Sequence, residues 1–131
     1  MTDEISQLEI AAKRIYLETF ELVLQTSFPC AEFHDPLVER VKLIAKECSI
    51  ELGDCFATAW LCHPAYWFAI ENVVVYVGGG NWDYRQPMTD ERKVELRNCY
   101  AACYESKYRE YVLANLKNAR SPKQENQENA V

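Results

Sequence analysis

The sequence predicts a mainly α-helical fold, a bundle of four to five helices with at most one short β element near residues 73–77. Apolar residues recur at three- and four-residue steps over long stretches, as they do along one face of a helix. Proline, glycine and capping residues divide the chain into segments of helix length. One short run, VVVYV at residues 73–77, is rich in β-branched residues and favours a strand instead.

The first two helices have recognisable ends. The first is predicted over residues 3–26, because Ser-Phe-Pro follows at 27–29 and the residue before a proline leaves the helical conformation. The second is predicted over residues 36–52, with Asp35 as its cap, Pro36 at its first position and Gly53 as its stop. The expected buried face of the first helix consists of Ile5, Leu8, Ala12, Ile15, Tyr16, Phe20 and Val23.

The middle of the chain is apolar on every side and is expected to lie inside the fold. Asp54 is placed to cap a short helix over residues 55–62, and a further helical segment is expected over residues 64–71. The valine-rich strand follows and ends at the three glycines 78–80. Because a strand needs a partner, either residues 82–85 return as a hairpin or a second subunit supplies the pairing.

The last helix is predicted to begin after Thr89, whose hydroxyl can cap it, and to run to about Asn118. Its apolar residues cover more than one face, so neighbours should contact it from several sides. Residues 119–131 contain almost no large apolar side chain and are expected to form a disordered tail. The predicted organisation is therefore one helical domain, residues 1–118, followed by this tail.

Composition and charge narrow the class of protein. The 131 residues are 49% hydrophobic and carry 14 basic against 20 acidic side chains, a net charge of -6. The basic residues are scattered among acids, which disfavours direct binding of nucleic acid. A protein with a basic surface is the expected partner, because opposite charge speeds and selects such encounters.

The chain is expected to be cytoplasmic. Its first residues, MTDEISQLE, are acidic where a secretory signal would be basic, and no apolar stretch follows them. The longest stretch without a charge, residues 55–70, is shorter than the ~20 apolar residues that a membrane-spanning helix needs. Six cysteines in such a chain are expected to be reduced.

The cysteines and histidines define an alternative hypothesis. Cys48, Cys55 and Cys62 are spaced by seven, but seven helical residues span about 10.5 Å, too far for one zinc ion. Cys99 and Cys103 are one turn apart, so they could bind a metal together with Cys62 or His63. A thiol- or metal-dependent sensor or small enzyme is therefore the alternative, with His34 or His63 as the candidate base.

Known site patterns are absent from the sequence. Neither a CxxC nor a paired-histidine motif occurs, so we expect no metal and no cofactor. His34-Asp35 lacks the further ligands of a metal-dependent phosphohydrolase, and the glycines at 78–80 match no phosphate-binding loop. Most of these residues have a structural interpretation, as buried thiols, a helix cap and a turn.

Two aromatic features stand out as candidate interfaces. Tyr100, Tyr104, Tyr108 and Tyr111 fall within about 80° on a helical wheel drawn at ~100° per residue, and packing against the first helix is their favoured interpretation. The second feature follows the glycines, in a segment expected to be a loop or a hairpin return. It contains Trp, Tyr and Arg, the residue types that dominate protein-binding hot spots, and its candidate residues are Trp82, Asp83, Tyr84 and Arg85.

The resulting hypothesis is a non-enzymatic, acidic protein-binding module. An inhibitor, an immunity protein or a phage-type antagonist would act in this way, by covering a protein surface. The predicted interface comprises residues 82–85 and the exposed parts of the tyrosine stripe. An assembly factor or subunit of a larger complex is a further alternative, and a homo-oligomer is compatible with the sequence.

Overall fold

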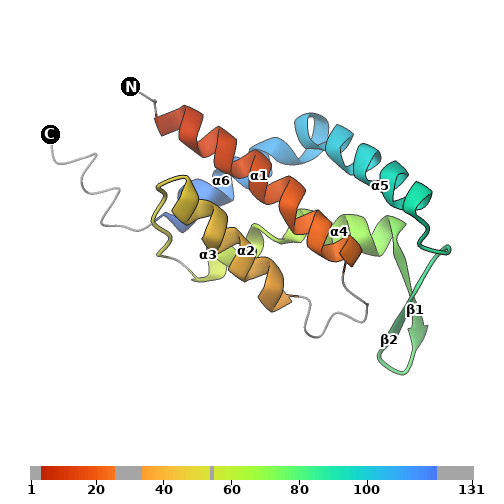
Figure 1. Cartoon of the computed structure of the whole chain (residues 1–131). Coiled ribbons are helices and arrows are strands. Elements are labelled where there is room, and N and C mark those ends of the chain that lie inside the picture. Colours follow the sequence, from red (N-terminus) through yellow and green to blue (C-terminus); the bar gives the residue numbers. More distant parts are fainter. Residues whose placement is uncertain (1–3, 26–33, 54, 121–131) are drawn as a thin grey trace, which may run out of the picture.

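The computed structural model describes residues 4–25, 34–53 and 55–120, and helices make up most of them (Figure 1). The predicted mainly helical class is confirmed. In chain order the elements are α1 (Glu4–Gln25), α2 (His34–Glu47), α3 (Cys55–Trp60), α4 (His63–Asn72), β1 (Val74–Gly78), β2 (Asn81–Tyr84), α5 (Asp90–Cys103), η2 (Tyr104–Tyr108) and α6 (Arg109–Ala119).

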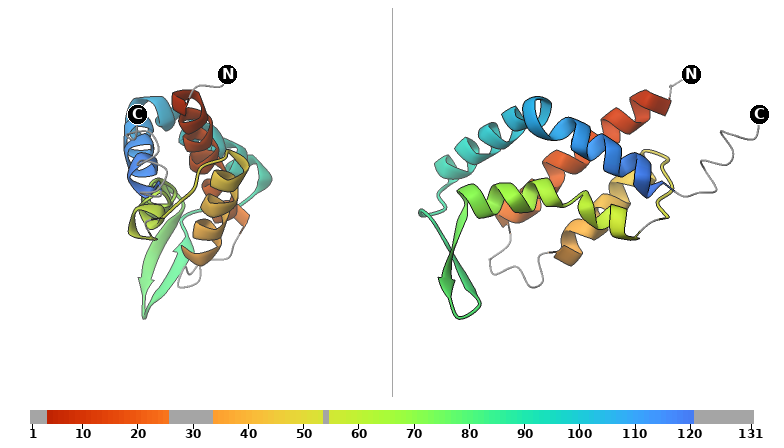
Figure 2. Two further views of the ribbon diagram at one scale, coloured as in Figure 1. Left: turned by 90° about the vertical axis from the view of Figure 1, so that its left-hand side faces the viewer. Right: turned by 180° about the vertical axis from the view of Figure 1, so that it is seen from behind.

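Helix α1 is the centre of the arrangement. It packs against α2, α4, α5 and α6, and Figure 2 shows it crossing the other helices. Its buried face repeats at helical spacing, as predicted, and removes its large apolar side chains from water. The buried residues of α1 are Leu8, Ala11, Ala12, Ile15, Tyr16, Thr19, Phe20, Val23 and Leu24.

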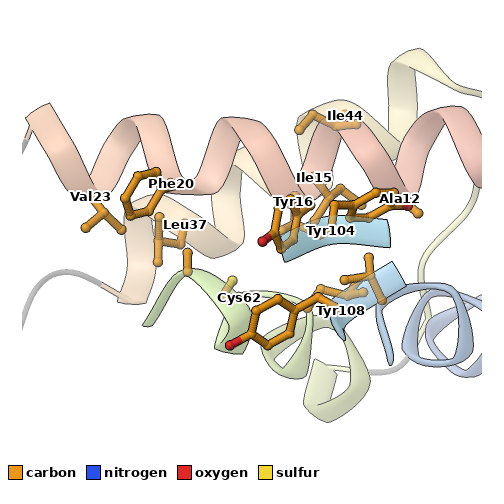
Figure 3. Close-up of a cluster of buried hydrophobic side chains, with 14 of the residues drawn as sticks. Ala12, Ile15, Tyr16, Phe20, Val23, Leu37, Ile44, Cys62, Tyr104 and Tyr108 are labelled. Atoms are coloured by element: carbon orange, nitrogen blue, oxygen red, sulfur yellow. The ribbon is translucent and has the colours of Figure 1, made fainter. Parts of the chain in front are cut away.

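Aromatic rings fill the space between α1 and the chain's last helices (Figure 3). Tyr16 stacks on Tyr100 with ring centroids 3.9 Å apart and planes 4° apart, and Phe20 stacks on the same ring at 4.2 Å. The hydroxyl of Tyr16 donates a hydrogen bond of 2.5 Å to the backbone carbonyl of Tyr100. Tyr104 and Tyr108 meet Tyr16 at tilted angles, with centroids 4.9 and 5.7 Å away. The tyrosine stripe is therefore largely core.

Helix α2 ends five residues earlier than the sequence predicted. Ser49 adopts a left-handed conformation with φ 60°, and its amide donates to the carbonyl of Lys46. The amide of the buried Ile50 donates to the carbonyl of Ala45 at 2.8 Å. This pair of bonds is a Schellman ending, which needs one left-handed residue and an apolar residue after it. Gly53 instead donates its amide to the carbonyl of Ala119 in α6.

The last helical run is continuous but not uniform. Thr89 caps α5 as predicted, because its hydroxyl accepts from the amide of Arg92. At η2 the chain forms a π-helical turn, in which the amide of Arg109 donates to the carbonyl of Tyr104, five residues earlier. Figure 2 shows the helix bending there, as helices do at such insertions.

The helical domain extends past its predicted boundary at residue 118. Ala119 is buried and is the last residue of α6, and Arg120 forms an isolated antiparallel bridge with Leu52. Two residues assigned to the tail therefore belong to the packed structure. The rest of the predicted tail, residues 121–131, lies outside the described residues, as does the predicted cap Asp54. Helix α2 begins at His34, so Asp35 lies inside the helix rather than at its predicted cap, and the side chain of Asp35 lies outside the described residues.

Removing the hydroxyl of Tyr16 and removing that of Tyr104 should change the free energy of unfolding differently. Tyr16→Phe should cost about 1 kcal/mol of folding free energy, because it deletes a buried hydrogen bond. Tyr104→Phe should be neutral or stabilising, because its buried hydroxyl has no hydrogen-bond partner among the described residues. Denaturant unfolding of both variants measures the difference. Equal losses of unfolding free energy in the two variants would show that the Tyr16 hydrogen bond adds no stability beyond that of an unbonded buried hydroxyl.

Candidate protein-binding surface

The β-hairpin follows α4 and stands away from the helices (Figures 1 and 2). Strand β1 pairs antiparallel with β2, from Val74 opposite Tyr84 to Gly78 opposite Asn81. Gly79 and Gly80, the two residues of the turn, have φ of 62° and 78°. Positive φ at both positions is the signature of the type I′ turn that suits tight hairpins, and glycine adopts it without strain. The predicted hairpin return is therefore present within this chain.

The outer part of the hairpin exposes three consecutive apolar side chains. Val75 is 38% exposed, Tyr76 54% and Val77 58%. The register shifts by one residue between Tyr76 and Gly78, which places a bulge at Val77. Bulges of this kind turn a side chain outward. These three residues were not among the predicted interface residues, although the valine-rich run had been identified as a strand.

Tyr76 is held in a defined position. Its ring meets that of Trp82 edge-on, with centroids 5.3 Å apart, and its hydroxyl accepts a hydrogen bond of 2.9 Å from the amide of Gly80. A cross-strand aromatic pair stabilises a hairpin and limits the rotamers of both rings. An exposed ring that is already ordered loses less entropy when a partner covers it.

The four hairpin residues that the sequence pointed to have different environments. They lie in and just after β2 rather than in a loop, and Trp82 and Tyr84 are half-buried against the core. Asp83 is exposed and accepts a hydrogen bond from the amide of Tyr84. Arg85 ties the hairpin to the helices, because its amide donates to Val73 and its guanidinium donates to the carbonyl of Ile70 at 2.8 Å.

The tyrosine stripe contributes little to the exterior. Tyr100, Tyr104 and Tyr108 are buried, which removes them from any exposed interface. Only Tyr111 is partly open, and its hydroxyl donates to the carbonyl of Trp60 at 3.3 Å. A π turn amounts to one inserted residue, which rotates all later positions by about 100°. Tyr111 is therefore turned away from the face that holds the other three.

The cysteine and histidine hypothesis finds little support. Among the described residues, no group of three or more His, Cys, Asp or Glu side chains is placed to hold a metal ion. Cys62 is buried, Cys99 is exposed, and His63 and Cys103 are half-buried. Burial raises the pKa of the Cys62 thiol to about 12, so the thiolate that a nucleophile needs is scarce near neutral pH.

The helices between 55 and 72 hold two exposed tryptophans that sequence reasoning passed over. Trp60 is 47% exposed and Trp67 is 38% exposed. This stretch was expected to be buried all round. A turn at residues 61–62 separates α3 from α4, so the two tryptophans lie on different helices. A single helical wheel could therefore not show that both indoles reach the surface.

The thiols should differ in reactivity as their burial does. In native protein at mildly alkaline pH, Cys99 should react quickly with an aromatic disulfide reagent, whereas Cys62 should react only after unfolding. Absorbance of the released thiol measures both phases. Cys99→Ala should remove one fast thiol, and Cys62→Ala should leave the fast count unchanged. A fast thiol that disappears in Cys62→Ala would revive the nucleophile hypothesis.

We compared the chain with known proteins and found no match. No protein-family model, curated protein or solved structure matches this chain. Within the part of the chain that the structure describes, no helix is both long enough and apolar enough to cross a membrane. The exposed side chains of the hairpin and of the helices are therefore the basis for a functional proposal.

Proposed function

We propose that this chain is a non-enzymatic protein-binding module that docks on a partner with the outer part of its hairpin. The observation that carries the proposal is the run of exposed apolar residues Val75, Tyr76 and Val77 on an element that projects from the helices. Burying apolar surface of this kind on a partner is the main driving force for association.

The hairpin has the charge pattern of an interface centre. Between residues 73 and 85 the only charged side chains are those of Asp83 and Arg85, in a chain whose net charge is -6. The centres of protein interfaces are depleted of charge, and their rims are polar. An apolar pocket surrounded by basic groups is the partner surface that fits, since the acidic body would then face the basic rim.

Covering another protein's surface suits an inhibitor, an immunity protein or a phage-type antagonist. Each of these acts by occupying a site, which needs a projecting element on a stable body rather than catalytic groups. An assembly factor or subunit would use the same surface. A thiol enzyme is less favoured, because the buried Cys62 is poorly suited to act as a nucleophile.

Substitution of two hairpin residues tests the proposal. The partner is first isolated by capture from the native cell and then purified, so that its dissociation constant can be measured by calorimetry. Tyr76→Ser and Val77→Ser should each weaken binding, and the tyrosine variant by roughly 2 kcal/mol if it is a hot spot. Val77→Ser should leave the melting temperature almost unchanged, because its side chain is 58% exposed. Tyr76→Ser also removes the ring contact with Trp82 and the hydrogen bond from Gly80, so it should lower the melting temperature slightly, and Val77→Ser is the cleaner probe.

The matched control is Val94→Ser on α5, where valine is 51% exposed. This variant should bind normally. Trp82→Ala is a poorer probe, because its half-buried ring packs on the core and its loss should lower stability as well. Normal binding by both hairpin variants would place the interface elsewhere and refute the proposal.

A further inference from the structure

Four aromatic side chains from α3, α4 and α6 form a closed circuit at the surface, which we call the aromatic circuit. The ring of His63 lies 4.6 Å from that of Trp60 and 5.2 Å from that of Trp67, between centroids. Trp67 in turn lies 5.3 Å from Tyr111. The hydroxyl of Tyr111 closes the circuit by donating to the carbonyl of Trp60.

The circuit is ordered but open to solvent. Trp60 and Trp67 expose 47% and 38% of their surface, and His63 and Tyr111 are partly exposed. All three ring contacts are tilted or edge-on, with planes 52° to 64° apart. In the core, by contrast, Tyr16 and Tyr100 stack face to face. Because Trp60 and Trp67 keep this much exposed surface, a cation can reach their rings, whose π electrons create a negative potential at the faces.

We infer that the aromatic circuit binds the guanidinium group of an arginine on a basic protein partner. A cation over an indole face is attracted by the ring quadrupole, and tryptophan is the strongest such acceptor. Guanidinium fits better than ammonium, because it is planar, stacks on rings and is weakly hydrated. The net charge of -6 attracts basic segments as a whole.

A neighbouring acid supports a cationic ligand. Glu71 is exposed and follows Trp67 by four residues on α4, so its carboxylate lies on the same helix face. The pKa of Lys107 is raised by its contact with Tyr108 and also by the Glu71 carboxylate, so this acid already attracts a cation of the chain itself. The circuit is separate from the hairpin, so this inference does not depend on the hairpin being the main interface.

Three capped peptides test the inference. In each of them three glycines alternate with residues of a single kind, which is arginine in the first peptide, lysine in the second and citrulline in the third. Citrulline has the shape of arginine without its charge. The indole N–H signals of the three tryptophans are followed by nuclear magnetic resonance up to millimolar peptide. The arginine peptide should shift the signals of Trp60 and Trp67 but not that of Trp82. The citrulline peptide should bind about ten-fold more weakly or not at all.

Matched variants assign the site. Trp60→Leu and Trp67→Leu should each weaken the arginine peptide about ten-fold, Glu71→Gln by less, and Trp82→Leu not at all. Trp67→Phe keeps an aromatic ring and should bind at an intermediate level, which separates the loss of a cation site from misfolding. Equal affinity for arginine and citrulline, equal loss in Trp82→Leu, or no shift at millimolar arginine peptide would each overturn the inference.

Discussion

The stack of Tyr16 on Tyr100 is the contact on which the rest of the structure depends. It joins α1 to α5 through two parallel rings, and the Tyr16 hydroxyl adds a hydrogen bond to the backbone of the same residue. Phe68 of α4 meets the rings of Phe20 and Tyr100 edge-on, both at 5.2 Å. Since β1 begins two residues after α4 ends, this aromatic core also fixes where the hairpin leaves the body.

The π turn at η2 decides which aromatic residues face inward. Tyr104 and Tyr108 lie within this turn, and both contact Tyr16. The inserted residue then rotates α6, so that Tyr111 meets Trp67 at the surface. π insertions cost helical hydrogen-bond geometry and are often found beside functional sites. Here the same turn completes the core on one side and the aromatic circuit on the other.

Sequence patterns predicted the elements better than the surfaces. The stripe of α1, the Thr89 cap and the hairpin return could be predicted, because periodicity, capping and turn chemistry are local. The end of α2 could not, since it depends on a left-handed Ser49 and on Ile50 reaching the core. Which side chains are exposed was predicted only in part. Tyr111 and Asp83 are accessible, but exposure of Trp60 and Trp67 follows from how three helices meet, which no window of sequence records.

The placement of charge supports the proposal of a partner with a basic surface. Within the described residues, ion pairs with acids of the same chain are made by Arg14, Arg40, Arg92, Arg97 and Arg109. Exposed pairs of this kind add at most about 1 kcal/mol each to stability, so their larger effect is to neutralise the chain's basic groups. The two that join α1 to the last helices, Arg97 with Glu21 and Arg109 with Glu9, frame the aromatic core. With these guanidiniums engaged, the chain presents excess carboxylates, a hairpin whose outer part is apolar, and two exposed indoles. In the proposed complex, a basic protein surface would complement the carboxylates and the indoles, because each attracts a cation, and an apolar pocket within it would receive the hairpin.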